Sequence, residues 1–417
     1  MRRRIAATAS EPTTAAATGR PASPRRTKRR RRIRGRPLAL GPFLSLLALL
    51  LWLPPPARGD PAPEEPDFSR VYPEPRDGLL LQPSPGWPLW LVDFETRART
   101  DETSGIAFLG RDRAGARLFL LADDTGRFHI CRVEDERGAA PRLQLERVAI
   151  APALFDSLSS YEHWDFEAVA VDLPRPRPPL RDSIRGWVSL EGRGPAFRPQ
   201  TSVYALSFAR SGDPARWRVG PIGPAIAGAR FWEGHVARNR GLEGLALGER
   251  LAFLGLESLS GRTQVSGAGT ILFVYDRQAE RVARIGTQLL GIDTICGLDA
   301  WGDSLSVLID RNQQSVFLLW WDPSVPGRIR AAQRHPLDLP TPEGFRYAVP
   351  SVEGLALDDG GDLWCVTDPW RGHYRPVGAV PETVAVYLEA EMPMLYRFPG
   401  KAIWQQAGLE HLWPPRP

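Results

Sequence analysis

The sequence predicts an all-β protein that folds as a single β-propeller of five four-stranded blades. Three observations carry this prediction. A short apolar run recurs five times, each recurrence is followed by further short apolar runs, and helical periodicity is almost absent. The clearest recurrence is "EGLAL", which begins at Glu243 and again at Glu353. Regular repeats of several short strands are the signature of propeller blades.

The first run of each repeat is predicted to be the innermost strand of a blade. The five runs read "SGIAF", "EAVAV", "EGLAL", "CGLDA" and "EGLAL". Each is a run of four or five mainly small and branched apolar residues between turns, and such a run is too short for a helix. A strand packed around a narrow axis favours Gly and Ala beside Leu, Ile and Val. The first residues of the runs are Ser104, Glu167, Glu243, Cys296 and Glu353.

The second and third runs complete most of each blade. The second runs are "RLFLLADD", "GWVSLEGR", "RLAFLGLES", "SLSVLIDRN" and "DLWCVTDPW", and third runs such as "RFHICRV" and "TILFVYD" follow them. A fourth, more polar run is visible in the first three units. Units of roughly 40–60 residues with four short strands are typical of propeller blades.

The segment "PLWLVDFETRA", residues 88–98, precedes the first unit and has no repeat of its own. The fourth run of the last unit is weak, so we expect this segment to supply the outer strand of the last blade. Closing the ring in this way leaves only short protected edges. Six blades are the alternative, if residues 70–96 form more than one strand.

The N-terminus is typical of an export signal. Residues 1–36 hold twelve arginines and Lys28 against one acid, Glu11, and sixteen uncharged residues follow from Leu38 to Leu53. That run is short for a membrane span, which needs about 20 residues, and suits the apolar region of a signal peptide. We expect cleavage near Gly59 and a periplasmic or secreted protein. An uncleaved signal-anchor, and so a membrane association, is the alternative.

These features divide the chain into four parts. Residues 1–59 are the basic and apolar signal segment, 60–86 a Pro-rich linker, 87–405 the propeller, and 406–417 a C-terminal tail. After Gly59 the chain has 39 basic and 47 acidic residues, which argues against a nucleic-acid-binding surface. Three widely spaced cysteines form neither a disulfide framework nor a zinc site, and we expect them to be buried.

Acidic residues occupy two equivalent positions of the repeats. In a blade the first strand begins, and the antiparallel second strand ends, on the same face. The side chains at these positions are therefore predicted to ring one mouth of the central channel. Oxygen ligands without His or Cys favour Ca²⁺, with Mg²⁺ second. The predicted ligands are Glu167, Glu243, Glu353, Asp123, Glu191, Glu257, Asp310 and Asp368.

Pairing with arginine, without a metal, is the alternative interpretation of these acids. An arginine follows the acid of each blade by one to five residues. Arginines beside a bound cation would also suit a phosphate or carboxylate substrate. His163 and His235 stand shortly before two of the glutamates and are predicted to lie near the same mouth. The arginines are Arg127, Arg193, Arg262, Arg311 and Arg371.

These motifs resemble the exported bacterial propellers of the phytase-like (esterase-like activity of phytase) family, and are similar to SdiA-regulated propellers. The resemblance rests on "SGIAF…LADDTGR", "DFEAVAVD…SLEGR", "RGLEGLAL…LGLES" and "SVEGLAL…CVTD", and covers about residues 100–400. "LADDTGRFHICRV" is also loosely similar to the five-bladed calcium-activated nucleotidases. Ala168, Ser104 and Cys296 depart from the family's Glu-Gly pattern.

The resemblance implies a hydrolase of phosphate or carboxylate esters, and two hypotheses follow. The first is an exported, monomeric, calcium-dependent hydrolase that takes a small anionic substrate at the acidic mouth. The second is a non-catalytic propeller that binds a ligand or protein partner on that face, with calcium serving stability. No nucleophile and base can be paired from the sequence alone, and a shared fold does not settle function.

Export predicts a mature chain that begins close to Asp60. Mass spectrometry of the N-terminus of protein made in a host with a secretory system measures this directly. A chain that begins at Met1 and accumulates in the cytoplasm would contradict the signal-peptide interpretation.

Overall fold

The computed structural model describes residues 72–403, apart from several short segments. The expectations for the signal segment, the first part of the linker and the tail therefore lie outside the described residues. Among the residues that are described, no helix is long and apolar enough to cross a membrane. The gaps are 136–139, 159–164, 176, 178–181, 194–198, 212–215, 227–230, 237–240, 259–268, 348–350, 370–373 and 402.

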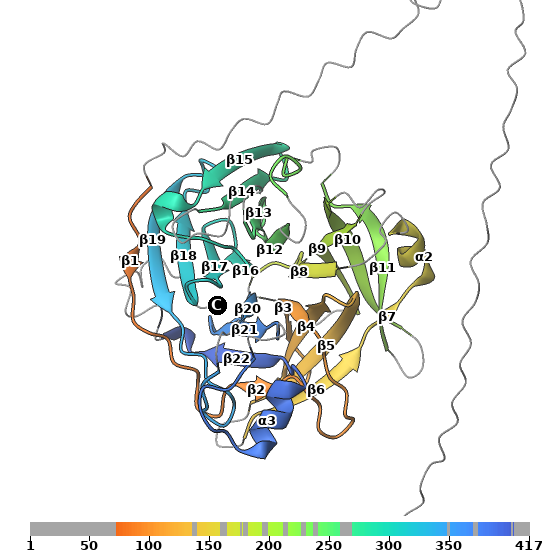
Figure 1. The fold of residues 1–417 in the computed structure, drawn as a ribbon. Coiled ribbons are helices and arrows are strands. Elements are labelled where there is room, and N and C mark those ends of the chain that lie inside the picture. Colours follow the sequence, from red (N-terminus) through yellow and green to blue (C-terminus); the bar gives the residue numbers. More distant parts are fainter. Residues whose placement is uncertain are drawn as a thin grey trace, which may run out of the picture. The chain divides into compact units, whose positions relative to one another are not determined.

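Five antiparallel sheets surround a common centre, which confirms the five-bladed propeller (Figure 1). Within each blade the strands follow one another from the centre outward. Blade 1 consists of β3 (Thr103–Arg111), β4 (Arg117–Asp123), β5 (Arg127–Glu134) and β6 (Arg142–Arg147). Blade 2 consists of β8 (Asp165–Val171), β9 (Ser183–Arg193), β10 (Pro199–Ser211) and β11 (Arg216–Pro224), with β7 (Ala149–Ile150) added in parallel outside β11.

The remaining blades repeat this plan. Blade 3 consists of β12 (Leu242–Leu247), β13 (Leu251–Leu256), β14 (Ile271–Asp276) and β15 (Arg281–Gly286). Blade 4 consists of β16 (Gly297–Trp301), β17 (Leu305–Asp310), β18 (Ser315–Trp321) and β19 (Ile329–Pro336). Blade 5 consists of β20 (Val352–Leu357), β21 (Leu363–Thr367) and β22 (Met394–Phe398).

The segment before the first repeat closes the ring, as expected. Strand β2 (Leu89–Trp90) pairs antiparallel with β22 and becomes the outer strand of blade 5. Residues 70–96 also contain a second strand, β1 (Arg76–Asp77), but it pairs in parallel with β19 on the edge of blade 4. These two strands therefore join two different blades, β2 as the fourth strand of blade 5 and β1 as a fifth strand of blade 4, and no sixth blade forms among the described residues.

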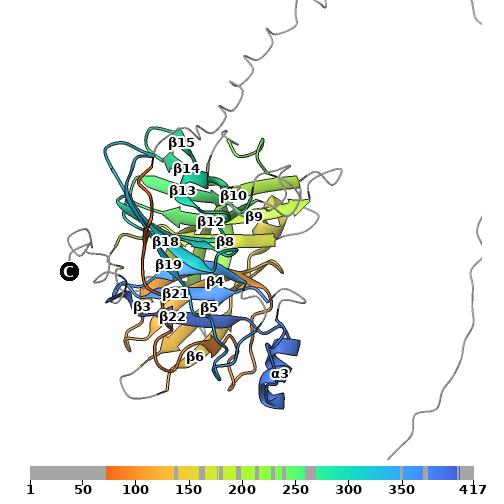
Figure 2. The ribbon, with the colours of Figure 1, turned by 60° about the vertical axis from the view of Figure 1, so that its left-hand side comes forward.

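Three helical segments of the described part of the chain lie in connections between strands, and residues 400, 401 and 403, after β22, are also helical. Helix α2 (Pro152–Ser157) precedes β8, and the short 3₁₀ helix η2 (Gln288–Leu290) precedes β16. Helix α3 (Glu382–Glu389) belongs to the long connection between β21 and β22, and Figure 2 shows it beyond the ends of the strands. Val384 and Leu388 anchor α3 to the core of blade 5. These helices leave the β architecture unchanged.

Buried aromatic side chains fill the space between blades. Trp364 of β21 is fully buried, and its ring centroid lies 4.7 Å from that of Phe119 in blade 1 and 5.0 Å from that of Trp87. The three cysteines are buried and unpaired, which agrees with the expectation from their spacing.

The inner strands pack side by side around the axis in the order β3, β8, β12, β16 and β20. The glycine in second position of the repeat permits this close approach. A Cβ added to Gly297 would overlap the carbonyl oxygen of Glu353 in the next blade and lie 2.9 Å from the nitrogen of Leu355. A Cβ on Gly354 would lie 2.9 Å from the carbonyl oxygen of Ser104. The Glu-Gly pair therefore combines a charged side chain with a residue that lets neighbouring strands meet.

We predict that Gly297→Ala destabilises the protein by roughly 1–3 kcal/mol, because the added methyl group has only backbone atoms to displace. Gly220→Ala is the matched control. It also lies in a strand, and its new Cβ would make an ordinary 3.7 Å contact with Ala151. Urea unfolding of both variants measures the difference. Equal stability of the two variants would contradict the close packing of inner strands.

Candidate functional site

A β-bulge stands at the start of the inner strand in four blades. In blade 1, Thr103 pairs with Asp123 and Gly105 pairs with Ala122, so Ser104 is the additional residue of the bulge. A bulge redirects the side chain of the additional residue, here at the mouth of the propeller. The bulged residues of the four blades are Ser104, Glu167, Glu243 and Glu353.

A second ring of side chains lies at the end of the second strand of each blade. The pairing between the first and second strands identifies the residue at this position. In blade 1 the residue after the bulge, Gly105, pairs with Ala122. In blade 4, which has no bulge, the equivalent residue Gly297 pairs with Ile309. In every blade, the residue that stands two positions after this second-strand partner in the sequence occupies the second ring position. This position is acidic in four blades and arginine in blade 4. Its residues are Asp124, Glu191, Glu257, Arg311 and Asp368.

Asp123 was expected at the mouth, but its carboxylate is fully buried and caps the neighbouring turn. It accepts hydrogen bonds from the backbone N–H of Asp101 at 3.0 Å and of Thr125 at 2.8 Å. The next residue, Asp124, takes the ring position and accepts a hydrogen bond from the hydroxyl of Ser104. Because Asp123 and Asp124 are adjacent, the sequence alone could not show which of them faces the mouth.

Asp310 requires the same correction. Its carboxylate accepts hydrogen bonds from the backbone N–H of Asp293 at 2.6 Å and of Gln313 at 3.0 Å, and from the hydroxyl of Thr294 at 3.1 Å. Asp310 therefore fixes the turn after β17, and Arg311 is the residue that faces the ring.

The mouth divides into two unlike halves. Between blades 1 and 2, carboxylate oxygens of Asp124, Asp165 and Glu167 all lie within 4.8 Å of one another. Among the described residues, no arginine or lysine is ion-paired with these three acids. Asp165 was missed in the sequence, although it stands two residues before Glu167 on the same inner strand, where alternate side chains share a face.

In the other half, Arg311 neutralises acids of two blades. Its guanidinium donates to Glu257 Oε1 at 2.6 Å and also to Glu353 Oε1. The hydroxyl of Ser351 donates to the same oxygen of Glu353 at 3.1 Å. The pairing of acid with arginine that the sequence offered as an alternative is thus present in this half of the mouth.

Glu191 and Glu243 are more than nine-tenths buried, with 6% and 8% of their surfaces exposed. Each has one carboxylate oxygen without a hydrogen-bond partner in the described part of the chain. Glycine makes room for the first of them, because a Cβ on Gly241 would overlap Glu191 Oε1. Buried carboxylate oxygens without partners are costly, which points to a ligand or a bound proton at this mouth.

Burial and mutual repulsion raise the pKa of most of these acids. Burial is the largest cause at Asp124, Glu167 and Glu243, and neighbouring carboxylates add to it, so their pKa values lie well above the usual range. The pKa of Asp165 is raised to about 7 by burial, and by the charges of Glu102 and other nearby acids. The pKa values of Glu191, Glu257 and Asp368 are also raised, mainly by burial.

The remaining candidates lie elsewhere or cannot be placed. Arg127 pairs with Asp101 beside the turn of blade 1. His235 packs against Phe273 of the third strand of blade 3, at 6.2 Å between ring centroids, rather than against an inner strand. Burial and the charge of Arg284 lower the pKa of His235. The side chains of Arg193, Arg262, Arg371 and His163 lie outside the described residues.

At the opposite end of the axis, Arg175 and Arg177, which follow β8, contact residues of other blades. Arg175 donates to Asp299 Oδ2 of blade 4 at 2.5 Å and to the carbonyl oxygen of Leu357 of blade 5 at 2.6 Å. Its side chain is only 5% exposed. The backbone N–H of Arg177 donates to Asp359 at 3.0 Å. A connection from blade 2 thus reaches blades 4 and 5 at this end, opposite the acidic mouth.

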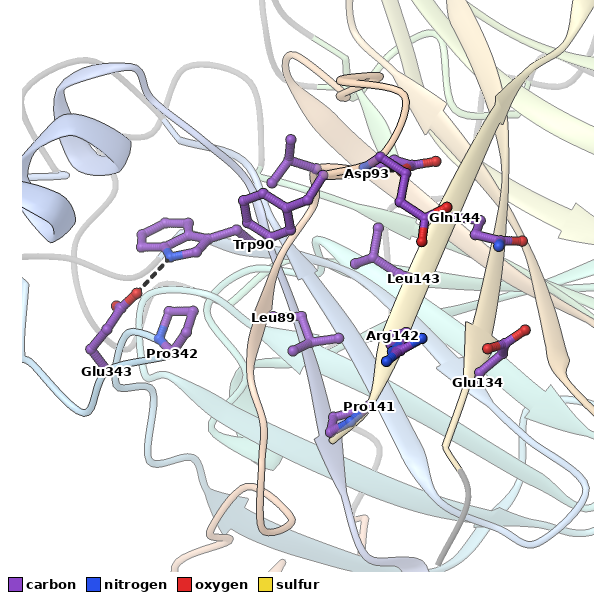
Figure 3. Close-up of a pocket in the computed structure, with 13 residues that line it drawn as sticks. Leu89, Trp90, Asp93, Glu134, Pro141, Arg142, Leu143, Gln144, Pro342 and Glu343 are labelled. Carbon is purple, nitrogen blue, oxygen red and sulfur yellow. Dashed lines mark hydrogen bonds between the residues drawn. The ribbon is translucent and has the colours of Figure 1, made fainter. Parts of the chain in front are cut away.

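A separate pocket of about 450 Å³ lies at the outer edge between blades 5 and 1 (Figure 3). Leu89, Trp90 and Leu143 supply much of its apolar lining, and the indole N–H of Trp90 donates to Glu343 Oε1 at 3.1 Å. None of the residues of the acidic mouth lines this pocket.

Comparisons with known proteins assign no family. No protein-family model and no curated protein matches the chain. Among solved structures, a glucose dehydrogenase is 13% identical and has a TM-score of 0.34, over 70% of this chain and 100% of that one. The soluble aldose sugar dehydrogenase of Escherichia coli is 10% identical, with a TM-score of 0.35, over 75% of this chain and 99% of that one.

Levansucrase of Bacillus subtilis is 8% identical, with a TM-score of 0.36, over 66% of this chain and 82% of that one. Similarities at this level carry no argument about activity. The resemblance to phytase-like propellers therefore stays a prediction.

In the presence of a metal chelator, we predict that stability falls as the pH rises. A carboxyl group whose pKa is higher in the folded state contributes stability below its unfolded pKa and loses it through the folded pKa. For Asp165 this window runs from 3.8 to about 7. Melting temperatures in chelator between about pH 5 and pH 8 measure the effect. Asp165→Asn should flatten the profile, whereas Asp156→Asn, on the exposed part of α2, should not. A parent profile that rises over this range would contradict the raised pKa values.

Proposed function

We propose that the protein is an exported, calcium-dependent hydrolase of phosphate or carboxylate esters that works at the acidic mouth. The observation that carries the proposal is the convergence of Asp124, Asp165 and Glu167 without a basic partner among the described residues. Like charges at this spacing require a cation or bound protons. The resemblance of the repeat motifs to phytase-like propellers supports the choice of ester substrates.

The donor set fits calcium. Ca²⁺ takes six to eight oxygen ligands at about 2.3–2.6 Å in flexible geometry, so two oxygens on opposite sides of the ion are about 4.8 Å apart. The oxygens of Asp124, Asp165 and Glu167 lie within that limit. Asp368 is close enough to raise the pKa of Asp124, and Asp165 is close enough to raise that of Glu191. Asp368 and Glu191 can therefore complete the oxygen shell of the ion.

The side chains around this position divide the chemical tasks. When bound, calcium would polarise a phosphoryl or carbonyl oxygen of the substrate. Burial raises the pKa of Glu243, which favours its protonated form, so we assign it the role of general acid toward the leaving oxygen. Arg311 is bonded to Glu257 and Glu353, so it shapes the mouth rather than binding the substrate.

A non-catalytic propeller with structural calcium is the second candidate. Hydroxyl groups at the mouth are engaged with acids, since Ser104 donates to Asp124 and Ser351 to Glu353. In the described part of the mouth, neither serine contacts a histidine. The missing nucleophile and base favour binding without turnover, or hydrolysis that depends on the metal alone.

Calcium is predicted to raise the melting temperature of the parent protein. Saturating metal at a hundredfold excess over Kd stabilises the fold by about 2.7 kcal/mol. Glu167→Gln keeps the shape and removes a ligand charge, so it should lose most of this shift. Asp276→Asn is the control, because Asp276 ends a third strand, where it accepts backbone hydrogen bonds from Gln278 and Ala279. A parent melting temperature unchanged by chelator would contradict the calcium site.

Hydrolysis of p-nitrophenyl phosphate and p-nitrophenyl acetate, with calcium and with chelator, separates the two candidates. The hydrolase proposal predicts turnover of one of these esters that requires calcium and is lost in Glu167→Gln. Calcium binding without turnover of either ester would favour the non-catalytic propeller.

A further inference from the structure

In blade 4, the position at the end of the second strand is occupied by a basic residue, Arg311. The equivalent residues of the other blades are all acids: Asp124, Glu191, Glu257 and Asp368. Arg311 lies opposite the cluster of Asp124, Asp165 and Glu167, in the half of the mouth formed by blades 3, 4 and 5. A positively charged side chain thus lies in a ring whose other four residues are acids.

The geometry around Arg311 is that of a cation held by several carboxylates. Its guanidinium donates to oxygens of Glu257 and Glu353, which come from blades 3 and 5. Burial alone would lower its pKa, but the charges of Glu353, Glu243 and Glu257 outweigh this and raise the pKa well above the usual value. Only 21% of its side chain is exposed. Arg311 therefore stays charged and remains in place.

The turn after β17 holds Arg311 toward the axis. Asp310 fixes this turn through the backbone N–H groups of Asp293 and Gln313, and the carbonyl oxygen of Arg311 accepts a hydrogen bond from the N–H of Gln314 at 3.2 Å. The acid that was expected to be a ligand thus serves to position a basic residue instead.

We propose that Arg311 is a built-in cation that fills half of the acidic mouth, so that the chain binds one divalent ion instead of two. The proposal rests on the calcium site proposed above for the other half. Glu243, Glu257 and Glu353 form the second site, and it becomes available to a metal only when Arg311 is replaced. Glu243 supports this assignment, because one of its buried carboxylate oxygens has no hydrogen-bond partner in the described part of the chain.

Removing the guanidinium takes away the positive charge that Glu257 and Glu353 share. Breaking a buried ion pair by deleting one partner is strongly destabilising, because the other charge stays buried. A divalent cation can replace the lost charge with oxygen ligands already in place. The stability of the variant should therefore depend on calcium more than that of the parent.

The test is the calcium stoichiometry of the parent and of Arg311→Met, measured by titration calorimetry and by metal analysis after equilibrium dialysis. We expect one ion per parent chain and two per variant chain. Arg311→Met should melt lower than the parent in chelator and recover more on addition of calcium. Arg311→Lys keeps the charge and should bind one ion, which provides a second measurement if the methionine variant does not fold.

Arg117→Met is the matched control. Arg117 is also largely buried and bonded to acids, with its Nε 2.7 Å from Asp358, but Arg397 still pairs with the nearby Asp362 and Asp135 after the change. This variant should lose stability and still bind one ion. Two ions in the parent or in Arg311→Lys, or one ion in both the parent and Arg311→Met, would overturn the proposal.

The same measurement distinguishes failure of the proposed calcium site from failure of the proposed role of Arg311. No ion in the parent and one in Arg311→Met would refute the calcium site of the other half and retain the role of Arg311. No ion in either protein would refute both proposals.

Discussion

The structure depends on balancing negative charge at one end of a narrow axis. Five inner strands converge there, and eight carboxyl groups reach the mouth from both ring positions and from Asp165. Among the residues that the structure describes, one guanidinium, that of Arg311, lies among them. Charges at this spacing cannot all remain unneutralised in a partly buried site. Protons, Arg311 and a bound cation are three ways to satisfy the constraint. Arg311 does so in the half formed by blades 3, 4 and 5, and the calcium proposed above would do so in the other half.

The same backbone features that build the ring also build the site. In blades 1, 3 and 5 a glycine follows the bulge and lets neighbouring inner strands meet, and the bulge directs the preceding side chain at the mouth. A residue such as Glu353 is therefore held by the packing of its own strand. At the other end of the axis, Arg175 joins the inner strands of blades 4 and 5. The positions of the acidic side chains at the mouth therefore follow from how the inner strands pack around the axis.

The sequence was sufficient for the blades and for the closing strand, because the Glu-Gly repeat and the unmatched "PLWLVDFETRA" are local signals. The sequence was a less reliable guide to which residues face the acidic mouth. Asp123 and Asp310 were placed one residue out, since a strand's last residue and the following turn residue look alike until the ladder register is known. The opposite roles of Asp310 and Arg311, and the reach of Arg175 across the axis, depend on contacts between distant segments that no single-sequence pattern contains.

Anomalous diffraction from crystals grown with calcium tests the central claim most directly. The account predicts one strong peak between the carboxylates of Asp124, Asp165 and Glu167, with Arg311 still bonded to Glu257 and Glu353. A mouth without a peak in calcium-soaked crystals, or a peak among Glu243, Glu257 and Glu353 with Arg311 displaced, would contradict it.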